Sequence, residues 1–135
     1  MPFFSIIIPV YNKTNFIENT LKSVFQQSFT DYEILLINDG STDDSESKIV
    51  TFNDSRIHYY SKKNEGVSET RNLGIEKAKS EFIVFLDADD YWYPNFLEEM
   101  FLLIKKPKQK ENLLSWQNTR LKRRSGLISM TWYQK

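Results

Sequence analysis

Short runs of apolar, β-branched residues alternate with segments of helical spacing through the first hundred residues of this chain. The runs that predict strands are 4–10, 32–37, 56–60 and 81–86, and the segments that predict helices are 16–25, 43–52, 66–79 and 94–105. Four strand–helix units in succession are typical of an open α/β sheet with mostly parallel strands and flanking helices. Right-handed crossovers place the carboxyl ends of such strands on one edge of the sheet, where ligands bind.

Composition narrows the class of protein further. The 135 residues are 40% apolar and 15% aromatic, which suits one folded domain with a sizeable core. The chain has no cysteine and a single histidine, His58, so disulfides, thiolate catalysis and histidine-based zinc sites are excluded. The longest wholly apolar runs, 82–86 and 101–104, are far shorter than the ~20 residues of a membrane span, and no signal-peptide pattern precedes the first strand. We therefore expect a cytoplasmic protein.

The net charge of zero hides a division along the chain. Residues 1–100 carry 9 basic and 17 acidic side chains, whereas residues 101–135 carry 9 basic and one acidic side chain. The acidic part disfavours a nucleic-acid-binding surface, which needs a basic face. We expect an α/β domain over residues 1–106 and a basic tail over residues 107–135. Within the tail, an amphipathic helix would use Leu113, Leu114, Trp116 and Leu121.

Three loops at the predicted carboxyl edge carry residues that suit a binding site. Asp87 and Asp89 leave the fourth strand one residue apart, and two such carboxylates suit a hard cation, Mg²⁺ or Mn²⁺. Asp39 follows the second strand in an NDGS turn, where it would accept hydrogen bonds from a base or ribose. Gly66 and Arg71 open the third helix, where a guanidinium can reach phosphate or base oxygens. We expect the three carboxylates to meet around one shared cation.

Each of these segments also has a purely structural interpretation. The DADD segment would be an acidic turn before the helix at Pro94, NDGS would be a surface turn, and Arg71 would pair with Glu69 or nearby acids. Alone, therefore, none of the three segments identifies a function.

Two details concern the helices themselves. Gly74 lies in the middle of a predicted helix, where glycine costs up to ~1 kcal/mol relative to alanine, so we expect close helix–sheet packing there. Asn15 and Glu18 have the spacing of a capping box for the first helix.

Taken in order, SIIIPVYN, NDGSTD, NEGVSETRNLGI and FIVFLDADD resemble glycosyltransferase family 2, over about residues 3–105. The resemblance implies a Rossmann-like nucleotide-diphospho-sugar transferase fold and a role in polysaccharide biosynthesis. The implied reaction is inverting, metal-dependent transfer of a sugar, from a UDP-sugar above other donors, to an acceptor hydroxyl. The residues implied for nucleotide binding are Pro9, Tyr11, Asn12, Asp39, Gly66, Arg71 and Asp87, and those implied for Mg²⁺ or Mn²⁺ are Asp89 and Asp87. Asn38 departs from the pattern, since many relatives have another aspartate there.

The tail also departs from the family. Relatives continue with strands that build the acceptor side and supply a carboxylate general base, and no such motif follows Asp90. We expect a truncated fold, and the alternative function is an inactive nucleotide-binding remnant or an interaction module. The implied partners are a saccharide or lipid-linked acceptor, further copies of the chain through an open sheet edge, and the inner face of the membrane through the tail.

Other α/β families fit less well. A dinucleotide-binding domain, a haloacid-dehalogenase-like phosphatase and a response-regulator receiver all carry their motifs after the first strand. Here that strand is followed by the turn PVYNKT, which has neither the glycines nor the acids.

Overall fold

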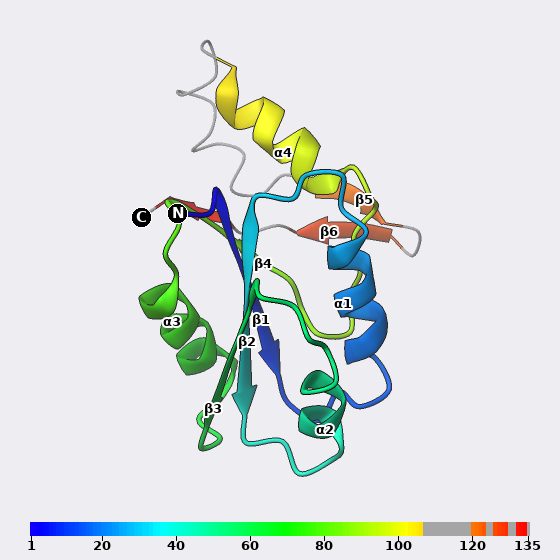
Figure 1. The fold of residues 1–135 in the computed structure, drawn as a ribbon, viewed down its shortest axis with the longest axis vertical. Coiled ribbons are helices and arrows are strands. Elements are labelled where there is room, and N and C mark those ends of the chain that lie inside the picture. Colours follow the sequence, from blue (N-terminus) through cyan, green and yellow to red (C-terminus); the bar gives the residue numbers. More distant parts are fainter. Residues whose placement is uncertain (107–119, 124–125, 130–131, 135) are drawn as a thin grey trace.

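A five-stranded sheet forms the centre of the molecule (Figure 1). The structure is a computed structural model that describes residues 1–106, 120–123, 126–129 and 132–134. The strand order is β3-β2-β1-β4-β7. The parallel strands are β1 (Phe4–Val10), β2 (Tyr32–Asp39), β3 (Ile57–Lys62) and β4 (Phe82–Phe85). The prediction of an α/β fold with a mostly parallel sheet is confirmed.

Helices cover both faces of the sheet. The helices are α1 (Ile17–Phe25), α2 (Ser45–Ile49), α3 (Val67–Lys77) and α4 (Phe96–Lys105). In Figure 1, α3 lies on one side of the strands, and α1 and α2 lie on the other. In the sheet, β2 and then β3 lie on one side of β1, and β4 lies on the other side. The strand order therefore reverses between β1 and β4. Open α/β sheets bind ligands at the carboxyl ends of the strands at such a point.

The alternation of side chains along β1 produces two separate cores. Ile6 and Ile8 belong to the larger cluster, which also contains apolar residues of α1 and α4. Ile7 points to the opposite face and packs with Leu35 and Ile83 beneath α3. Both faces of the strand are thus buried, which explains why its sequence is almost continuously apolar.

Gly74 brings α3 into direct contact with the sheet. A Cβ atom built on Gly74 would lie 2.5 Å from Cγ2 of Ile7, closer than any side chain can approach. The expected close packing at this glycine is therefore confirmed. The expected capping box is wrong, because α1 begins at Ile17 after Phe16 and has no side-chain cap. Glu18 instead forms an ion pair with Lys48, 3.2 Å away.

The described parts of the tail are strands. β5 (Arg120–Arg123) pairs antiparallel with β6 (Gly126–Ser129), so the expectation of a helix is wrong at Leu121. Leu113, Leu114 and Trp116 lie outside the described residues. β7 (Trp132–Gln134) pairs antiparallel with β4 and covers the edge that we expected to be open. Within the described residues, no helix combines the length and the apolar composition needed to cross a membrane.

Candidate functional site

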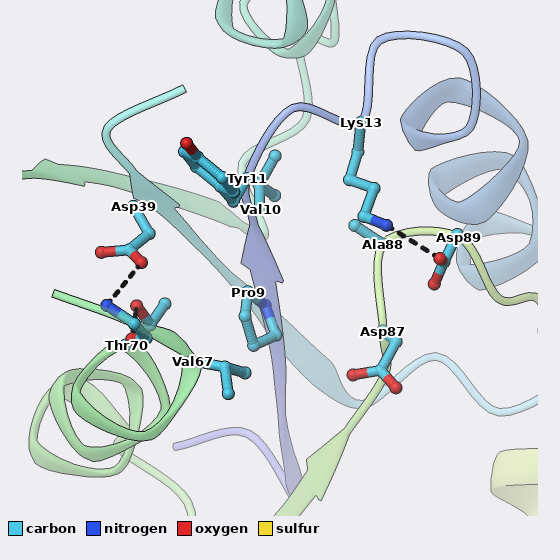
Figure 2. Close-up of a pocket in the computed structure, with 11 residues that line it drawn as sticks. Pro9, Val10, Tyr11, Lys13, Asp39, Val67, Thr70, Asp87, Ala88 and Asp89 are labelled. Carbon is cyan, nitrogen blue, oxygen red and sulfur yellow. Dashed lines mark hydrogen bonds and ion pairs between the residues drawn. The ribbon is translucent and has the colours of Figure 1, made fainter. Parts of the chain in front are cut away.

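A pocket of about 380 Å³ opens at the carboxyl edge of the sheet, where the strand order reverses (Figure 2). Residues from the ends of β1, β2 and β4 and from the start of α3 form its walls. The lining residues are Pro9, Val10, Tyr11, Lys13, Asp39, Gly66, Val67, Thr70, Asp87, Ala88 and Asp89.

Most of the residues that the sequence nominated line this pocket. They are Pro9, Tyr11, Asp39, Gly66, Asp87 and Asp89. Asn12 and Arg71 are not among the lining residues, and each instead holds a neighbouring group in place. The topology therefore brings the nominated residues to one edge, while their roles in binding stay predictions.

Asp39 ties the end of β2 to the loop before α3. The residue is only 4% exposed, and its carboxylate accepts hydrogen bonds from the backbone N–H groups of Glu65 (3.0 Å) and Gly66 (2.9 Å). The ammonium group of Lys62 donates to the same carboxylate at 2.6 Å. Burial alone would raise the pKa of Asp39, but these hydrogen bonds outweigh it and hold the pKa below its ordinary value. Asp39 is thus an ionised acceptor at one wall of the pocket.

Two of the acids after β4, Asp87 and Asp89, each face a cation. Asp87 forms an ion pair with Arg71, whose Nη2 lies 3.1 Å from its Oδ1. Asp89 forms an ion pair with Lys13, with 2.9 Å between Nζ and Oδ2 (Figure 2). The guanidinium of Arg71 also lies over the ring of Phe85, 5.5 Å from its centroid. Arg71 therefore pairs with a nearby acid, as the structural interpretation allowed, and this acid is Asp87 of the pocket rather than Glu69.

The expectation that three carboxylates share one cation is wrong. Asp39 lies on the opposite side of the pocket from Asp87 and Asp89 (Figure 2). It follows β2, whereas the other two follow β4, and β1 runs between these strands. Two strand spacings amount to about 10 Å, whereas carboxylates bind Mg²⁺ or Mn²⁺ at about 2 Å. Among the described residues, no group of three or more acidic, histidine or cysteine side chains is placed to hold a metal ion.

A pair of carboxylates remains as the candidate metal site. Asp87 and Asp89 both line the pocket and are both partly exposed, so a hydrated cation can reach their oxygens. Mg²⁺ typically binds proteins through one or two carboxylates, together with waters and substrate phosphates. The two residues fit a cation of this kind whose remaining ligands come from a diphosphate and from water.

Asn12 fixes the shape of the loop that follows β1. Its backbone has φ 51°, a left-handed conformation that asparagine tolerates better than most residues. Its Oδ1 accepts a hydrogen bond from the N–H of Thr42 at 2.8 Å, and its own N–H donates to Oγ of Ser41 at 3.0 Å. These bonds join the β1–α1 loop to the β2–α2 loop. Tyr11, the preceding residue, is held half-exposed at the pocket with a flat apolar face.

The sequence reasoning missed Lys13, which contributes the cation opposite Asp89. The available signal was its position just after the first strand, on the same predicted edge as the acids. What the sequence does not show is that β4 lies next to β1, and only this order brings Lys13 and Asp89 together. Val67 and Thr70 were also missed. Both lie in the first turn of α3, and both line the wall of the pocket.

Comparison with known proteins adds a finding of a different kind. Over residues 5–124 the chain matches the family described as Glycosyl transferase family 2. This match runs past residue 106, where we expected the likeness to stop. A protein of Rickettsia bellii described as an uncharacterized glycosyltransferase is 47% identical over 96 residues, which are 70% of this chain and 14% of that protein. A protein of Haemophilus influenzae with the same description is 39% identical over 102 residues, which are 73% of this chain and 41% of that protein.

Solved structures share the fold. S. aureus TarS 1-349 in complex with UDP-GlcNAc has a TM-score of 0.72 and 29% identity, over 76% of this chain and 31% of that one. The mannosyltransferase PcManGT of Pyrobaculum calidifontis, in complex with GDP-Man and Mn²⁺, has a TM-score of 0.72 and 24% identity, over 78% of this chain and 33% of that one. The present chain thus spans less than half the length of each of these proteins. Because the family match covers residues 5–124 and the fold is shared with these solved structures, the chain belongs to glycosyl transferase family 2.

Proposed function

We propose that the pocket binds the nucleoside-diphosphate sugar, a UDP-sugar, from which a family 2 glycosyltransferase transfers the sugar to an acceptor hydroxyl. The observation that carries this proposal is the separation of Asp39 from Asp87 and Asp89 across one pocket. One wall offers an ionised acceptor for polar N–H or O–H groups, and the other offers two carboxylates for a cation. The UDP-GlcNAc complex of TarS supports this class of donor.

The chain's own residues suggest an orientation for the donor. Asp39 would accept hydrogen bonds from the base or ribose, and Tyr11 would lie against the flat face of the base. Asp87 would face the ribose or the donor sugar, and Asp89 would hold the cation. Pro9, which has no N–H group, would form part of the apolar floor between these ends.

The cation end would provide the charge stabilisation for sugar transfer. A Mg²⁺ or Mn²⁺ ion held there would neutralise the negative charge that develops on the departing diphosphate. In an inverting reaction the acceptor hydroxyl attacks the anomeric carbon directly, while a general base removes its proton. The carboxylates that line the pocket all have donor-side roles in this assignment. The base would therefore come from outside the pocket-lining residues.

The alternative function is binding of the donor without transfer. The chain spans 14% of the Rickettsia bellii protein and 41% of the Haemophilus influenzae protein, so transfer by this chain is a separate proposal from donor binding. Binding and turnover must therefore be measured separately.

A thermal-shift titration of the full chain with UDP, with and without Mn²⁺, tests the binding. Ligand at ~100 times its dissociation constant should stabilise the fold by about 2.7 kcal/mol. Asp39→Asn and Asp89→Asn should both weaken this shift, and only Asp89→Asn should remove its dependence on Mn²⁺. Asp31→Asn is the control, because Asp31 is an exposed acid just before β2, at the opposite edge of the sheet. No shift with millimolar UDP and Mn²⁺ would contradict the proposal.

Turnover distinguishes the two functions. Transfer or hydrolysis of a UDP-sugar by this chain that needs Mn²⁺ and is lost in Asp89→Asn would identify a transferase that works alone. Binding of UDP without turnover would identify a donor-binding unit.

A further inference from the structure

In the described structure, each acid that lines the pocket lies against a cation. Asp39 contacts Lys62 at 2.6 Å, and the corresponding distances are 3.1 Å for Asp87 with Arg71 and 2.9 Å for Asp89 with Lys13. Lys62 also contacts Glu65 at 3.0 Å and is therefore shared between two acids. A divalent cation that reaches Asp89 therefore meets a carboxylate that already has a positively charged neighbour.

The backbone of Lys13 is fixed by hydrogen bonds. The N–H of Lys13 donates to Oγ of Ser45 at 2.8 Å, and its carbonyl oxygen accepts hydrogen bonds from the N–H groups of Phe16 and Ile17 at 2.9 and 3.0 Å. The side chain itself is one-third exposed and can swing away into water. Lys13 thus has a fixed backbone and an ammonium group that can move.

We propose that Lys13 acts as a built-in counter-ion at the metal site. Its ammonium group must move away from Asp89 before a metal cation can bind there. The proposal rests on the assignment of Asp89 to the cation in the proposed function. The ammonium group contacts Oδ2 of Asp89, and a divalent cation at the same carboxylate would lie close to it, so the two positive charges repel each other and compete for the carboxylate. The diphosphate of a donor brings negative charge to the same place and gives the displaced ammonium group a new partner. Lys13 therefore makes cation binding depend on the nucleotide, which is a coupling between two ligands.

Direct measurement of Mn²⁺ binding tests this competition without any turnover. The free Mn²⁺ is measured by electron paramagnetic resonance during titration of the full chain with the metal alone. Lys13→Met should bind Mn²⁺ about twofold to fivefold more tightly than the wild type, which is the range that a partly exposed ion pair provides. Lys13→Arg keeps the charge and should bind Mn²⁺ as the wild type does. An increase in affinity is informative because loss of a merely structural residue would leave it unchanged or lower it.

Lys48→Met is a closely matched control. Lys48 and Glu18 form an ion pair at 3.2 Å with exposures of 34% and 45%, compared with 33% and 42% for Lys13 and Asp89. Neither Lys48 nor Glu18 lines the pocket. This substitution should leave the affinity for Mn²⁺ unchanged.

The coupling is measured by repeating the titrations in the presence of UDP. UDP should raise the affinity for Mn²⁺ by a larger factor in the wild type than in Lys13→Met. Equal Mn²⁺ affinities of the wild type and Lys13→Met, with the metal alone, would overturn the proposal even if UDP binds as expected. Failure of the wild type to bind UDP would instead overturn the proposed function, and the titrations with Mn²⁺ alone would still decide the role of Lys13.

Discussion

Gly74 is the position where one added methyl group tests how α3 packs on the sheet. A Cβ atom at this residue would lie 2.5 Å from Cγ2 of Ile7, 3.0 Å from Cδ1 and 3.1 Å from Cγ1. Ile7 is fully buried between Leu35 and Ile83 in the smaller core cluster. The methyl group of Gly74→Ala can therefore be accommodated only if Ile7 or the helix moves.

The expected change in stability combines two opposing effects. Replacing glycine by alanine inside a helix favours folding by ~1 kcal/mol, whereas overpacking a core costs about 1–3 kcal/mol. We expect Gly74→Ala to lower the free energy of unfolding by about 1 kcal/mol. In an Ile7→Ala background the three close atoms are gone, so the same change should raise stability by about 1 kcal/mol. The two sites should thus show a coupling energy of about 2 kcal/mol.

Urea unfolding followed by circular dichroism measures these values. Asn72→Ala is the control, because Asn72 is an exposed residue of α3, where alanine should stabilise the helix by about 0.5 kcal/mol. If Gly74→Ala also stabilises the wild-type chain, the close contact with Ile7 does not limit the packing and our reasoning is wrong.

Two further predictions concern buried acids. Because the pKa of Asp39 in the folded chain lies below its ordinary value of ~3.9, its contribution to stability is complete above that pH and is lost as the pH falls through the folded pKa. Asp39→Asn should therefore lose less stability than the wild type when urea unfolding is compared at pH 5 and pH 3; equal losses would contradict this. Glu33 is 3% exposed, and its carboxylate accepts hydrogen bonds from Ser5 and from the N–H of Lys79. Glu33→Ala should lower the free energy of unfolding by about 1–3 kcal/mol in the same assay, and a cost below about 0.5 kcal/mol would show that these donors find other partners.

The sequence predicted the fold because its signals are local. The almost continuous apolar run of β1 identifies a strand buried on both faces, and the helical spacing after it identifies α1. The rule that parallel strands end on one edge then placed Asp39 and Asp87 at the same pocket. Local signals were less reliable at the ends of elements. The capping box failed because α1 begins at Ile17, after Phe16 rather than after Asn15, and Glu18 pairs instead with Lys48 on α2, a contact between elements that chain spacing does not show.

The order of the strands was the information that the sequence lacked. Consecutive strands could have continued in one direction, and nothing local indicates that β4 returns to the other side of β1. This order explains two of the errors at the site. It brings Lys13 against Asp89, a pair that we missed, and it separates Asp39 from Asp89 by the width of β1, which excludes the shared cation that we expected.

The separation of Asp39 from Asp87 and Asp89 (Figure 2) indicates the shape of a suitable ligand, which three carboxylates around one cation would not have indicated. A cation bound by three carboxylates needs no nucleotide, whereas two unlike walls about two strand spacings apart, about 10 Å, suit an elongated ligand with chemically different ends. A nucleoside diphosphate has this form, with hydrogen-bond donors on its base and ribose and negative charge on its phosphates. Asp39, fixed by the backbone N–H groups of Glu65 and Gly66, suits the first end, and the carboxylate of Asp89 with its exchangeable cation suits the second. Under the proposed function, the reversal of strand order at β1 sets the distance between the two ends of the bound donor.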